Sequence, residues 1–275
     1  DNPLVYVQQS KLGKQNVMLA ESRLQVSKTS LMRDVKTTYL NLQYAEMLVK
    51  QLFYQDSLFN NLAIAVEKRF NAGDVGMLEK ISANAQSKEI SNELNQAKAD
   101  LLNAQQQLQL LIGSKNANII TNTELSKIAF SVPVILGVDT SAIKSSPLIK
   151  YYEQNINVSK QNLRLQRSRL APGFMVGYLN QAGPEQPTNF RVRYGITIPI
   201  WFWTYSSQIK AAKYQYQMSQ SQYFIAQKNY GSQYQQAIAD AKKFVESINY
   251  YESAPGGLQQ AETIISAASR SYQSG

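Results

Sequence analysis

The side chains that most enzymes use for catalysis are missing from this chain. Its 275 residues include no histidine and no cysteine, which excludes Ser-His triads, histidine acid–base chemistry, disulfides and Cys-His zinc sites. Carboxylate, lysine or tyrosine chemistry would remain, but no pair of carboxylates and no nucleophile beside a base stands out in the sequence. No cluster of acidic or methionine side chains points to a metal ion. We therefore expect a protein that is not an enzyme, with no cofactor and no metal site.

Basic residues outnumber acidic ones, 28 to 19, and give the chain a net charge of +9. Such an excess can indicate a nucleic acid or an anionic membrane as partner. The basic residues are scattered, and the nearest cluster lies along a predicted helix: Lys160, Arg164, Arg167 and Arg169. This cluster is either a solvated helix face or a stripe that binds phosphate groups, and no aromatic residues alternate with it as on an RNA-binding surface. We expect no nucleic-acid partner, although a basic helical protein that binds nucleic acid stays as a third alternative.

Long segments repeat small or apolar residues at alternating steps of four and three. Residues 15–70 contain neither glycine nor proline, and their repeated positions are Leu31, Val35, Thr38, Leu42, Ala45, Val49 and Leu52. The same spacing recurs at Ile90, Leu94, Ala97, Leu101, Ala104, Leu108 and Leu111, and again at Ile209, Ala212, Tyr216, Ser219, Tyr223, Ala226 and Tyr230. It predicts long helices that each bury one narrow stripe against a partner and leave their other faces in water.

Turn signals separate these helices. Gly73 suits the end of the first helix, Asp74 can cap the second, and Gly113 follows the end of the second. The two helices therefore form an antiparallel hairpin whose arms extend roughly 57 Å, at 1.5 Å per residue. Residues 116–145 are predicted to be a connector. Pro147 at a first helical position, after Ser146 as N-cap, then begins another helix.

The period of the pattern changes to two near residue 190. Phe190, Val192, Tyr194, Ile196 and Ile198 alternate with polar or small residues, and residues 173–180 read as the partner strand. Strands of this length and alternation can cross a bilayer when tilted. The same pattern also fits an ordinary hairpin that lies half-buried on a soluble core. The aromatic run that follows, Trp201, Phe202 and Trp203, suits either a membrane interface or the closed end of a helical bundle.

The order of elements occurs twice. Pro3-Leu4 leads into a long helix as Pro199-Ile200 does, residues 69–73 match residues 271–275, and residues 253–257 account for the difference in length and predict a kink or break. The first repeat spans 1–115, with the end of a strand and a long helical hairpin, and the connector spans 116–145. The second repeat spans 146–275, with a helix, a β-hairpin at about 173–200 and a long helix truncated at its tip. Since no return arm follows, we expect a fragment of a longer protein, or one whose flanking segments are disordered or removed.

In this order the elements resemble the TolC-like outer-membrane efflux channels, the outer membrane factors of tripartite efflux pumps. The resemblance rests on Ile198-Pro199-Ile200 at the end of a strand, the turn Arg69-Phe70-x-x-Gly73, the segment 75–79 (Val-Gly-Met-Leu-Glu) and the closing Leu111-Ile112-Gly113. It covers nearly the whole chain. The fold it implies is mainly α, with long antiparallel coiled-coil helical hairpins in two pseudo-repeats of the α-barrel type. A β-hairpin would join a membrane β-barrel.

The resemblance also implies a function. It is that of an outer-membrane channel and periplasmic tunnel, a passive exit duct that docks to a periplasmic adaptor (membrane fusion protein) and an inner-membrane pump. A homotrimer in contact with outer-membrane lipid is implied, in the outer membrane and periplasm of a Gram-negative bacterium. The alternative is a soluble periplasmic coiled-coil scaffold or adaptor. An adaptor would carry compact lipoyl-like β domains beside its hairpin rather than the alternating strand near residue 190.

Three groups of residues receive roles from this resemblance. The adaptor-docking hairpin tip comprises Arg69, Gly73, Val75, Gly76 and Met77. The membrane-facing strand comprises Phe190, Val192, Tyr194, Ile196 and Ile198, and the interfacial aromatic residues are Trp201, Phe202 and Trp203. The two glycines of the tip have a second explanation, since glycine also permits a tight turn.

Overall fold

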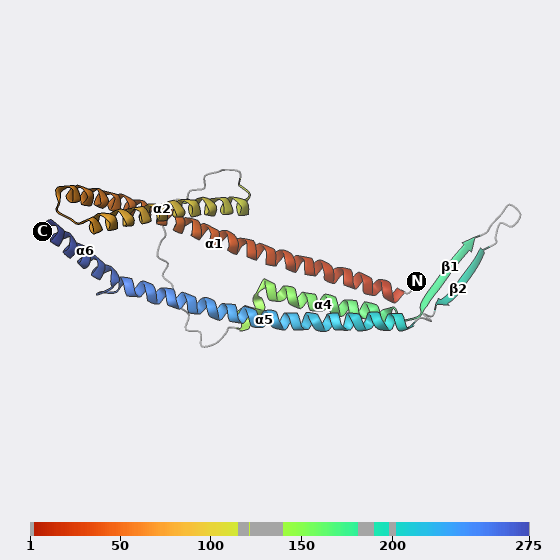
Figure 1. The fold of residues 1–275 in the computed structure, drawn as a ribbon. Coiled ribbons are helices and arrows are strands. Elements are labelled where there is room, and N and C mark those ends of the chain that lie inside the picture. Colours follow the sequence, from red (N-terminus) through yellow and green to blue (C-terminus); the bar gives the residue numbers. More distant parts are fainter. Residues whose placement is uncertain (1–2, 115–120, 122–139, 181–189, 198–201, 275) are drawn as a thin grey trace. The chain divides into compact units, whose positions relative to one another are not determined.

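A computed structural model describes residues 3–114, 121, 140–180, 190–197 and 202–274 (Figure 1). The chain divides into two compact units, one formed by residues 1–26 and 130–275 and the other by residues 27–129. The first helix, α1 (Pro3–Ala72), contributes to both units. The first predicted repeat is helical from Pro3 onward, and residues 1–2, where a preceding strand would end, lie outside the described residues. Within the described ranges, none of the helices has the length and apolar character that a membrane span requires.

The unit of residues 27–129 contains an antiparallel helical hairpin formed by α1 and α2 (Met77–Ile112). Its core cluster consists of Leu52, Leu94 and Ala97, with Leu48 and Val49 packed against it. The predicted seam positions that are buried are Thr38, Leu42, Ala45 and Leu52 on α1, and Ile90, Leu94, Ala97 and Leu108 on α2. The spacing of four and three therefore identified the contact stripe of both helices, although Leu31, at the start of the predicted seam, is 49% exposed.

Polar pairs beside this seam fix the register of the two helices. The Ser87 hydroxyl donates a hydrogen bond to Asn60 Oδ1 at 2.8 Å, and the Ser91 hydroxyl donates one to Asp56. One heptad closer to the turn, Lys80 Nζ lies 3.0 Å from Glu67 Oε1. These partners step by seven and then four residues along each helix in opposite directions, as an antiparallel coiled coil requires.

The turn between α1 and α2 ends one helix with a left-handed glycine. Gly73 has a φ of 83°, its N–H donates to the carbonyl of Phe70, and the N–H of Asp74 donates to the carbonyl of Arg69. This is a Schellman motif. Asp74 therefore belongs to the cap of α1, and the prediction that it caps α2 is wrong. The N-cap of α2 is Gly76, and the side chain of Glu79 accepts the hydrogen bond from its N–H.

The other unit places three helices side by side. Helix α4 (Pro147–Ser168) begins after the N-cap Ser146, as predicted, and follows the short α3 (Thr140–Ser145). Along one side of α4, Gln154 Nε2 donates to Gln15 Oε1 on α1 at 2.8 Å, and Gln161 Nε2 donates to Gln8 Oε1 at 2.6 Å. Along its other side α4 packs against α5 (Phe202–Glu252), whose buried seam residues are Ala212, Ser219 and Ala226.

A β-hairpin connects α4 to α5. Its strands, β1 (Gly173–Asn180) and β2 (Phe190–Thr197), are antiparallel. Beyond α5 the chain breaks before α6 (Gly257–Ser274), at the position predicted from the sequence. A Cβ on Gly256 would lie 2.1 Å from the carbonyl oxygen of Ser253, so only glycine fits the close approach of the backbone there.

Replacing Gly73 with alanine is expected to destabilise the α1–α2 turn by about 1 kcal/mol, because an L side chain is strained in the left-handed region. Gly13→Ala is the matched control. A Cβ on Gly13 would meet no atom within 4 Å, and alanine inside a helix should stabilise it by about 0.5–1 kcal/mol. Amide hydrogen exchange of residues 66–82 measures the first effect. An unchanged exchange rate in Gly73→Ala would contradict the assignment of this turn.

Candidate functional site

The tip of the α1–α2 hairpin is the first candidate surface. Of the predicted tip residues, Arg69 and Val75 are half-buried, while Gly73, Gly76 and Met77 are exposed. The conformations of the two glycines differ. Gly73 needs its positive φ, whereas Gly76 has a φ of −82° that any residue adopts. The explanation of glycine as a turn former therefore holds for Gly73 and not for Gly76.

The first turn of α2 presents an apolar surface that the sequence analysis identified only in part. Met77 is 57% exposed, Leu78 is 78% exposed and Ile81 is 53% exposed. Because α2 begins at Met77, these positions fall on the outward side of its first turn, opposite the seam that begins with Ser87 and Ile90. The signal that could have identified Leu78 is the start of α2. With Asp74 as the predicted N-cap, α2 would begin at residue 75, two residues before its observed start at Met77.

Charged side chains brace the base of this tip. Besides its ion pair with Glu67, Lys80 Nζ lies 4.9 Å from the centre of the Phe70 ring. The Glu79 side chain accepts from the backbone of Gly76 in the first turn, where a negative charge also favours the helix dipole. The apolar surface of Met77, Leu78 and Ile81 is thus held on a turn whose two helix ends are both capped.

The β-hairpin is the second candidate surface. Its register pairs Phe174 with Ile196, Val176 with Tyr194, Tyr178 with Val192, and Asn180 with Phe190. Cross-strand partners lie on the same face of a sheet, so the apolar residues of both strands share one face. The exposed residues of this apolar face are Phe174, Val176, Tyr178, Val192, Tyr194 and Ile196. Each of these residues is between 46% and 78% exposed.

The opposite face of the β-hairpin carries charge and glycine. Arg191 pairs with Leu179, Arg193 pairs with Gly177, and Gly195 pairs with Met175. Both arginines are exposed. The hairpin therefore has one apolar face, as the alternation predicted. Its other face is mixed rather than polar, because Met175 and Leu179 of β1 add exposed apolar side chains to it.

Part of the predicted membrane surface falls on residues outside the described ranges. Ile198 and Trp201 lie outside them, and the side chains of Phe190, Phe202 and Trp203 are likewise not described. Phe190 is the first residue of β2, and Phe202 and Trp203 are the first residues of α5. The role predicted for the three aromatic residues stays a prediction.

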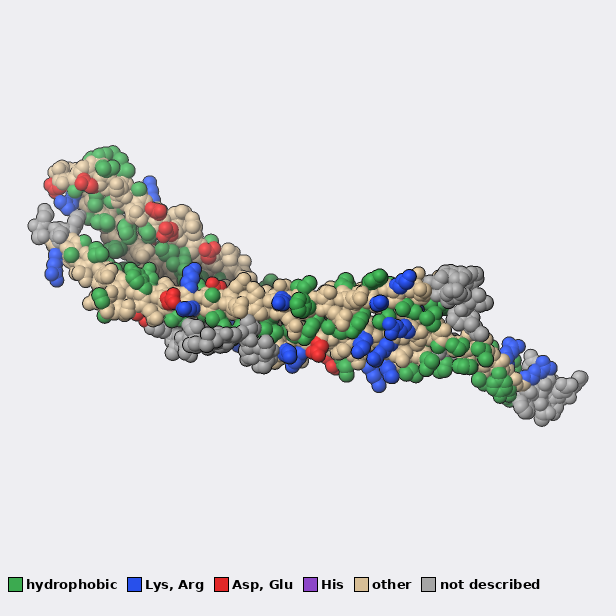
Figure 2. Space-filling model, turned by 90° about the horizontal axis from the view of Figure 1, so that it is seen from below, with side chains coloured by type: hydrophobic (Ala, Val, Ile, Leu, Met, Phe, Trp, Pro, Cys, Tyr) green, Lys and Arg blue, Asp and Glu red, His purple; other side chains and the backbone are tan. Residues whose placement is uncertain are grey.

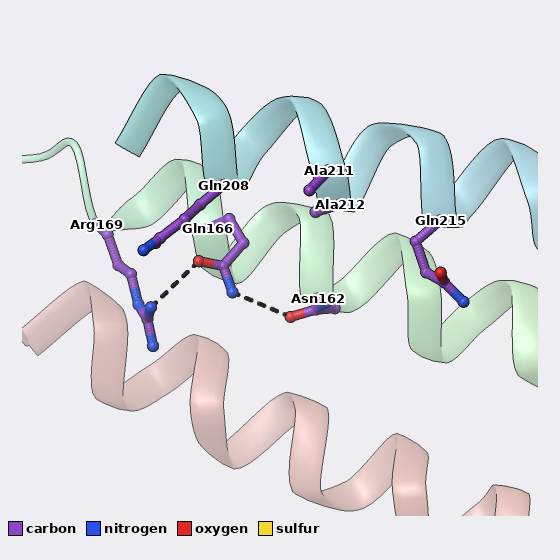
Figure 3. Close-up of a pocket in the computed structure, with 7 residues that line it drawn as sticks. All are labelled: Asn162, Gln166, Arg169, Gln208, Ala211, Ala212 and Gln215. Atoms are coloured by element: carbon purple, nitrogen blue, oxygen red, sulfur yellow. Dashed lines mark hydrogen bonds between the residues drawn. The ribbon is translucent and has the colours of Figure 1, made fainter. Parts of the chain in front are cut away.

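A pocket of about 350 Å³ lies between α4 and α5 near the β-hairpin (Figure 3). Its lining residues are Asn162, Gln166, Arg169, Gln208, Ala211, Ala212 and Gln215. Arg169 Nη1 donates to Gln166 Oε1, and Gln166 Nε2 donates to Asn162 Oδ1, both at 3.2 Å. The lining holds no carboxylate, hydroxyl or thiol, so it offers no nucleophile and no general base. Across the described residues no three acidic side chains gather as a metal site would need.

Replacing Glu79 with alanine is expected to loosen the first turn of α2 by about 0.5–1 kcal/mol, because its N-terminal N–H groups lose a charged acceptor. Glu93→Ala is the control, since Glu93 is exposed in the middle of the same helix. Hydrogen exchange at residues 76–81 should accelerate in the first variant alone. Equal exchange in both variants would show that Glu79 does not cap the helix.

Comparisons with known proteins agree with this geometry. The family model of outer membrane efflux proteins matches residues 140–275, just under half of the chain. A search of curated protein sequences finds no match. The fold is similar to that of the Campylobacter jejuni outer membrane channel CmeC, with a TM-score of 0.79 and 17% identity over 98% of this chain and 59% of that chain.

Other solved structures are similar to the same degree. The Vibrio cholerae outer membrane protein VceC has a TM-score of 0.77 and 17% identity over 96% of this chain and 64% of its own. The open state of the Neisseria gonorrhoeae outer membrane channel MtrE has a TM-score of 0.75 and 17% identity, over 98% of this chain and 62% of the MtrE chain. The chain thus spans about three fifths of the length of these structures. Its fold is that of the TolC-like channels, mainly α with long helical hairpins and a β-hairpin.

Proposed function

We propose that this chain, whose residues 140–275 match the family model of outer membrane efflux proteins, is part of the outer-membrane channel and periplasmic tunnel of a tripartite efflux pump. The channel is a passive exit duct in the outer membrane and periplasm of a Gram-negative bacterium. It performs no covalent chemistry, which is consistent with a sequence that lacks histidine and cysteine. The solved structures to which the chain is similar are membrane channels and outer membrane proteins.

The apolar face of the β-hairpin is the observation that carries this proposal. Val176 is 71% exposed and Tyr194, its partner, is 78% exposed. A face made of six such side chains is costly in water, at about 25 cal/mol for each Å² of apolar surface. Strands of eight residues with one apolar face suit a barrel whose outside meets lipid and whose hydrogen bonds are all satisfied between strands.

A second stripe on α1 supports assembly with further copies of the chain. At steps of four and three, this stripe contains Leu40, Tyr44, Met47, Gln51, Tyr54 and Leu58, all exposed and all but Gln51 apolar or aromatic. It repeats the seam spacing on a face that α2 does not cover. We infer that this stripe packs against a helix of a neighbouring protomer, and that the assembly is the homotrimer implied by the resemblance.

The apolar tip of α2 supports docking to a periplasmic adaptor, which links the channel to an inner-membrane pump. Met77, Leu78 and Ile81 form a small exposed apolar surface on a capped, braced turn. A few well-packed residues near the centre of an interface carry most of its binding energy. Among the five predicted tip residues, Met77 is the one that belongs to this surface, and Leu78 and Ile81 extend it.

Lysine on the apolar face of the β-hairpin is expected to reduce insertion into the outer membrane. Val176→Lys places a charge where we expect lipid, at a cost of about 2–4 kcal/mol near the bilayer centre. Met175→Lys is the matched control, because Met175 is the adjacent residue and lies on the opposite face. The measurement is the yield of folded trimer in outer-membrane fractions of cells that make the complete protein. Equal yields for both variants would favour a soluble periplasmic scaffold or adaptor.

Aspartate at the tip of α2 is expected to weaken adaptor binding at least about tenfold, because a charge replaces an apolar contact in the interface. Leu78→Asp is the test variant. Leu110→Asp is its control, since Leu110 lies near the other end of α2 and is 82% exposed. Binding of the purified channel to its adaptor is measured by surface plasmon resonance, and efflux is measured in cells. If both variants bind alike, the docking surface lies elsewhere.

A further inference from the structure

The positive charge of this chain is concentrated around the β-hairpin. Residues 154–239 hold nine Lys and Arg against one acidic residue, Glu185, while the remaining residues hold 19 against 18. Nearly the whole net charge of +9 therefore arises in the segment that contains the hairpin and the helix ends beside it. Figure 2 shows Lys and Arg side chains gathered over the part of the molecule where α4 and α5 approach the hairpin.

On α4 these charges occupy a single solvent-facing stripe. Helix α4 is covered by α1 on one side and α5 on the other, and its buried residues include Ser159, Gln161, Leu163 and Leu165. The exposed positions of α4 are Leu148 and Lys150 in its first turn and then Glu153, Asn157, Lys160, Arg164 and Arg167, which follow one another at steps of four and three. The only acidic residue of this stripe lies at the end remote from the hairpin.

The register of α4 and α5 places a basic residue of α5, Lys210, beside the basic end of α4. Residues 162 and 215 line one end of the pocket between these helices, and residues 169 and 208 line the other. This antiparallel register sets Arg167 of α4 level with Lys210 of α5. We call Lys160, Arg164, Arg167 and Lys210 the basic collar. At 1.5 Å per residue, each lies within roughly 12 Å of the hairpin end of its helix.

Interactions within the protein do not account for the collar. In the described ranges, no hydrogen bond or ion pair engages the side chains of Lys160, Arg164 and Arg167. Arg167 in the last turn of α4 does favour the helix dipole. The dipole explains one charge at most, because its effect is confined to the last turn and because Lys210 lies near the N-terminal end of α5, where the dipole disfavours a cation.

We propose that the basic collar binds the phosphate groups of anionic phospholipids in the membrane leaflet that faces the periplasm. The inference rests on the proposed function, in which the β-hairpin crosses the outer membrane. Where the strands end and the helices begin, the chain passes the headgroup layer, and the collar lies there. Long basic side chains reach headgroup depth while their stems cover apolar surface. Each Lys or Arg near an anionic membrane adds attraction that falls off within a Debye length, about 8–10 Å.

The test uses the complete protein in phosphatidylcholine vesicles that carry a trace of spin-labelled phosphatidylglycerol or spin-labelled phosphatidylcholine. Electron paramagnetic resonance gives the fraction of each label whose motion the protein restricts. We expect phosphatidylglycerol to associate at least about threefold more strongly than phosphatidylcholine in 0.05 M NaCl, and this ratio to fall towards one in 0.5 M NaCl.

Two variants with equal loss of charge locate the effect. Lys160→Gln/Arg164→Gln/Arg167→Gln should bring the ratio close to one. Lys228→Gln/Lys242→Gln/Lys243→Gln should keep it, because these exposed residues begin roughly 39 Å along α5 from its hairpin end. In both variants the restricted fraction of phosphatidylcholine should equal that of the native protein, which shows that each is folded and inserted.

Different failures identify different errors. In one failure the protein restricts phosphatidylcholine without preferring phosphatidylglycerol, and in another both variants lose the preference equally. Either result overturns the proposal that the basic collar binds anionic phospholipids, and leaves the channel assignment standing. A collar that lines the tunnel or binds a protein partner would give this result. If the protein restricts neither label, the membrane placement of the hairpin fails, and the collar fails with it.

Discussion

The narrow seam between antiparallel helices is the constraint on which the described structure depends. Its positions repeat at steps of four and three. The buried side chains include small ones, such as Ala97 and Ala212, and larger ones, such as Leu42 and Leu94. Such a seam lets helix backbones approach closely but buries only one stripe of each helix. The remaining surface of a long helix must then meet water, lipid or another chain. Exposed apolar side chains outside the seam, such as Tyr54 and Leu58 on α1, therefore indicate surfaces that bind a partner.

The two candidate surfaces lie where the seam can no longer continue. At Gly73 the chain must reverse, and the caps of two helices meet within a few residues, so Met77, Leu78 and Ile81 are left exposed on the outward side of the start of α2. At the end of α4 the helical period gives way to a period of two, and the residues on the apolar face of the β-hairpin are exposed. Each surface is thus held by rigid helices and faces away from the seams, which is where a docking partner or a membrane can reach it.

Periodic features were predictable from the sequence, and features set by a single hydrogen bond were not. The seams, the N-cap at Ser146 and the break before α6 all follow from spacing, proline or glycine, and the structure confirms them. The start of α2 was predicted two residues early, because Asp74 is a standard capping residue and the sequence does not show that its N–H completes the cap of α1. That shift hid Leu78, the most exposed apolar residue of the tip. The register that pairs Val176 with Tyr194 depends on the conformation of the loop between the strands, so it could not be predicted from the sequence.

The polar pairs along the α1–α2 seam determine how this hairpin can move. Sliding α1 along α2 by one residue would separate Lys80 from Glu67, Ser87 from Asn60 and Ser91 from Asp56 together, because all three belong to one register. Each pair contributes on the order of 1 kcal/mol or less, but their simultaneous loss adds to the mismatch of the apolar seam. The short turn at Gly73 allows no slack to absorb such a shift. We therefore expect helices α1 and α2 to move as one body over the length of these pairs.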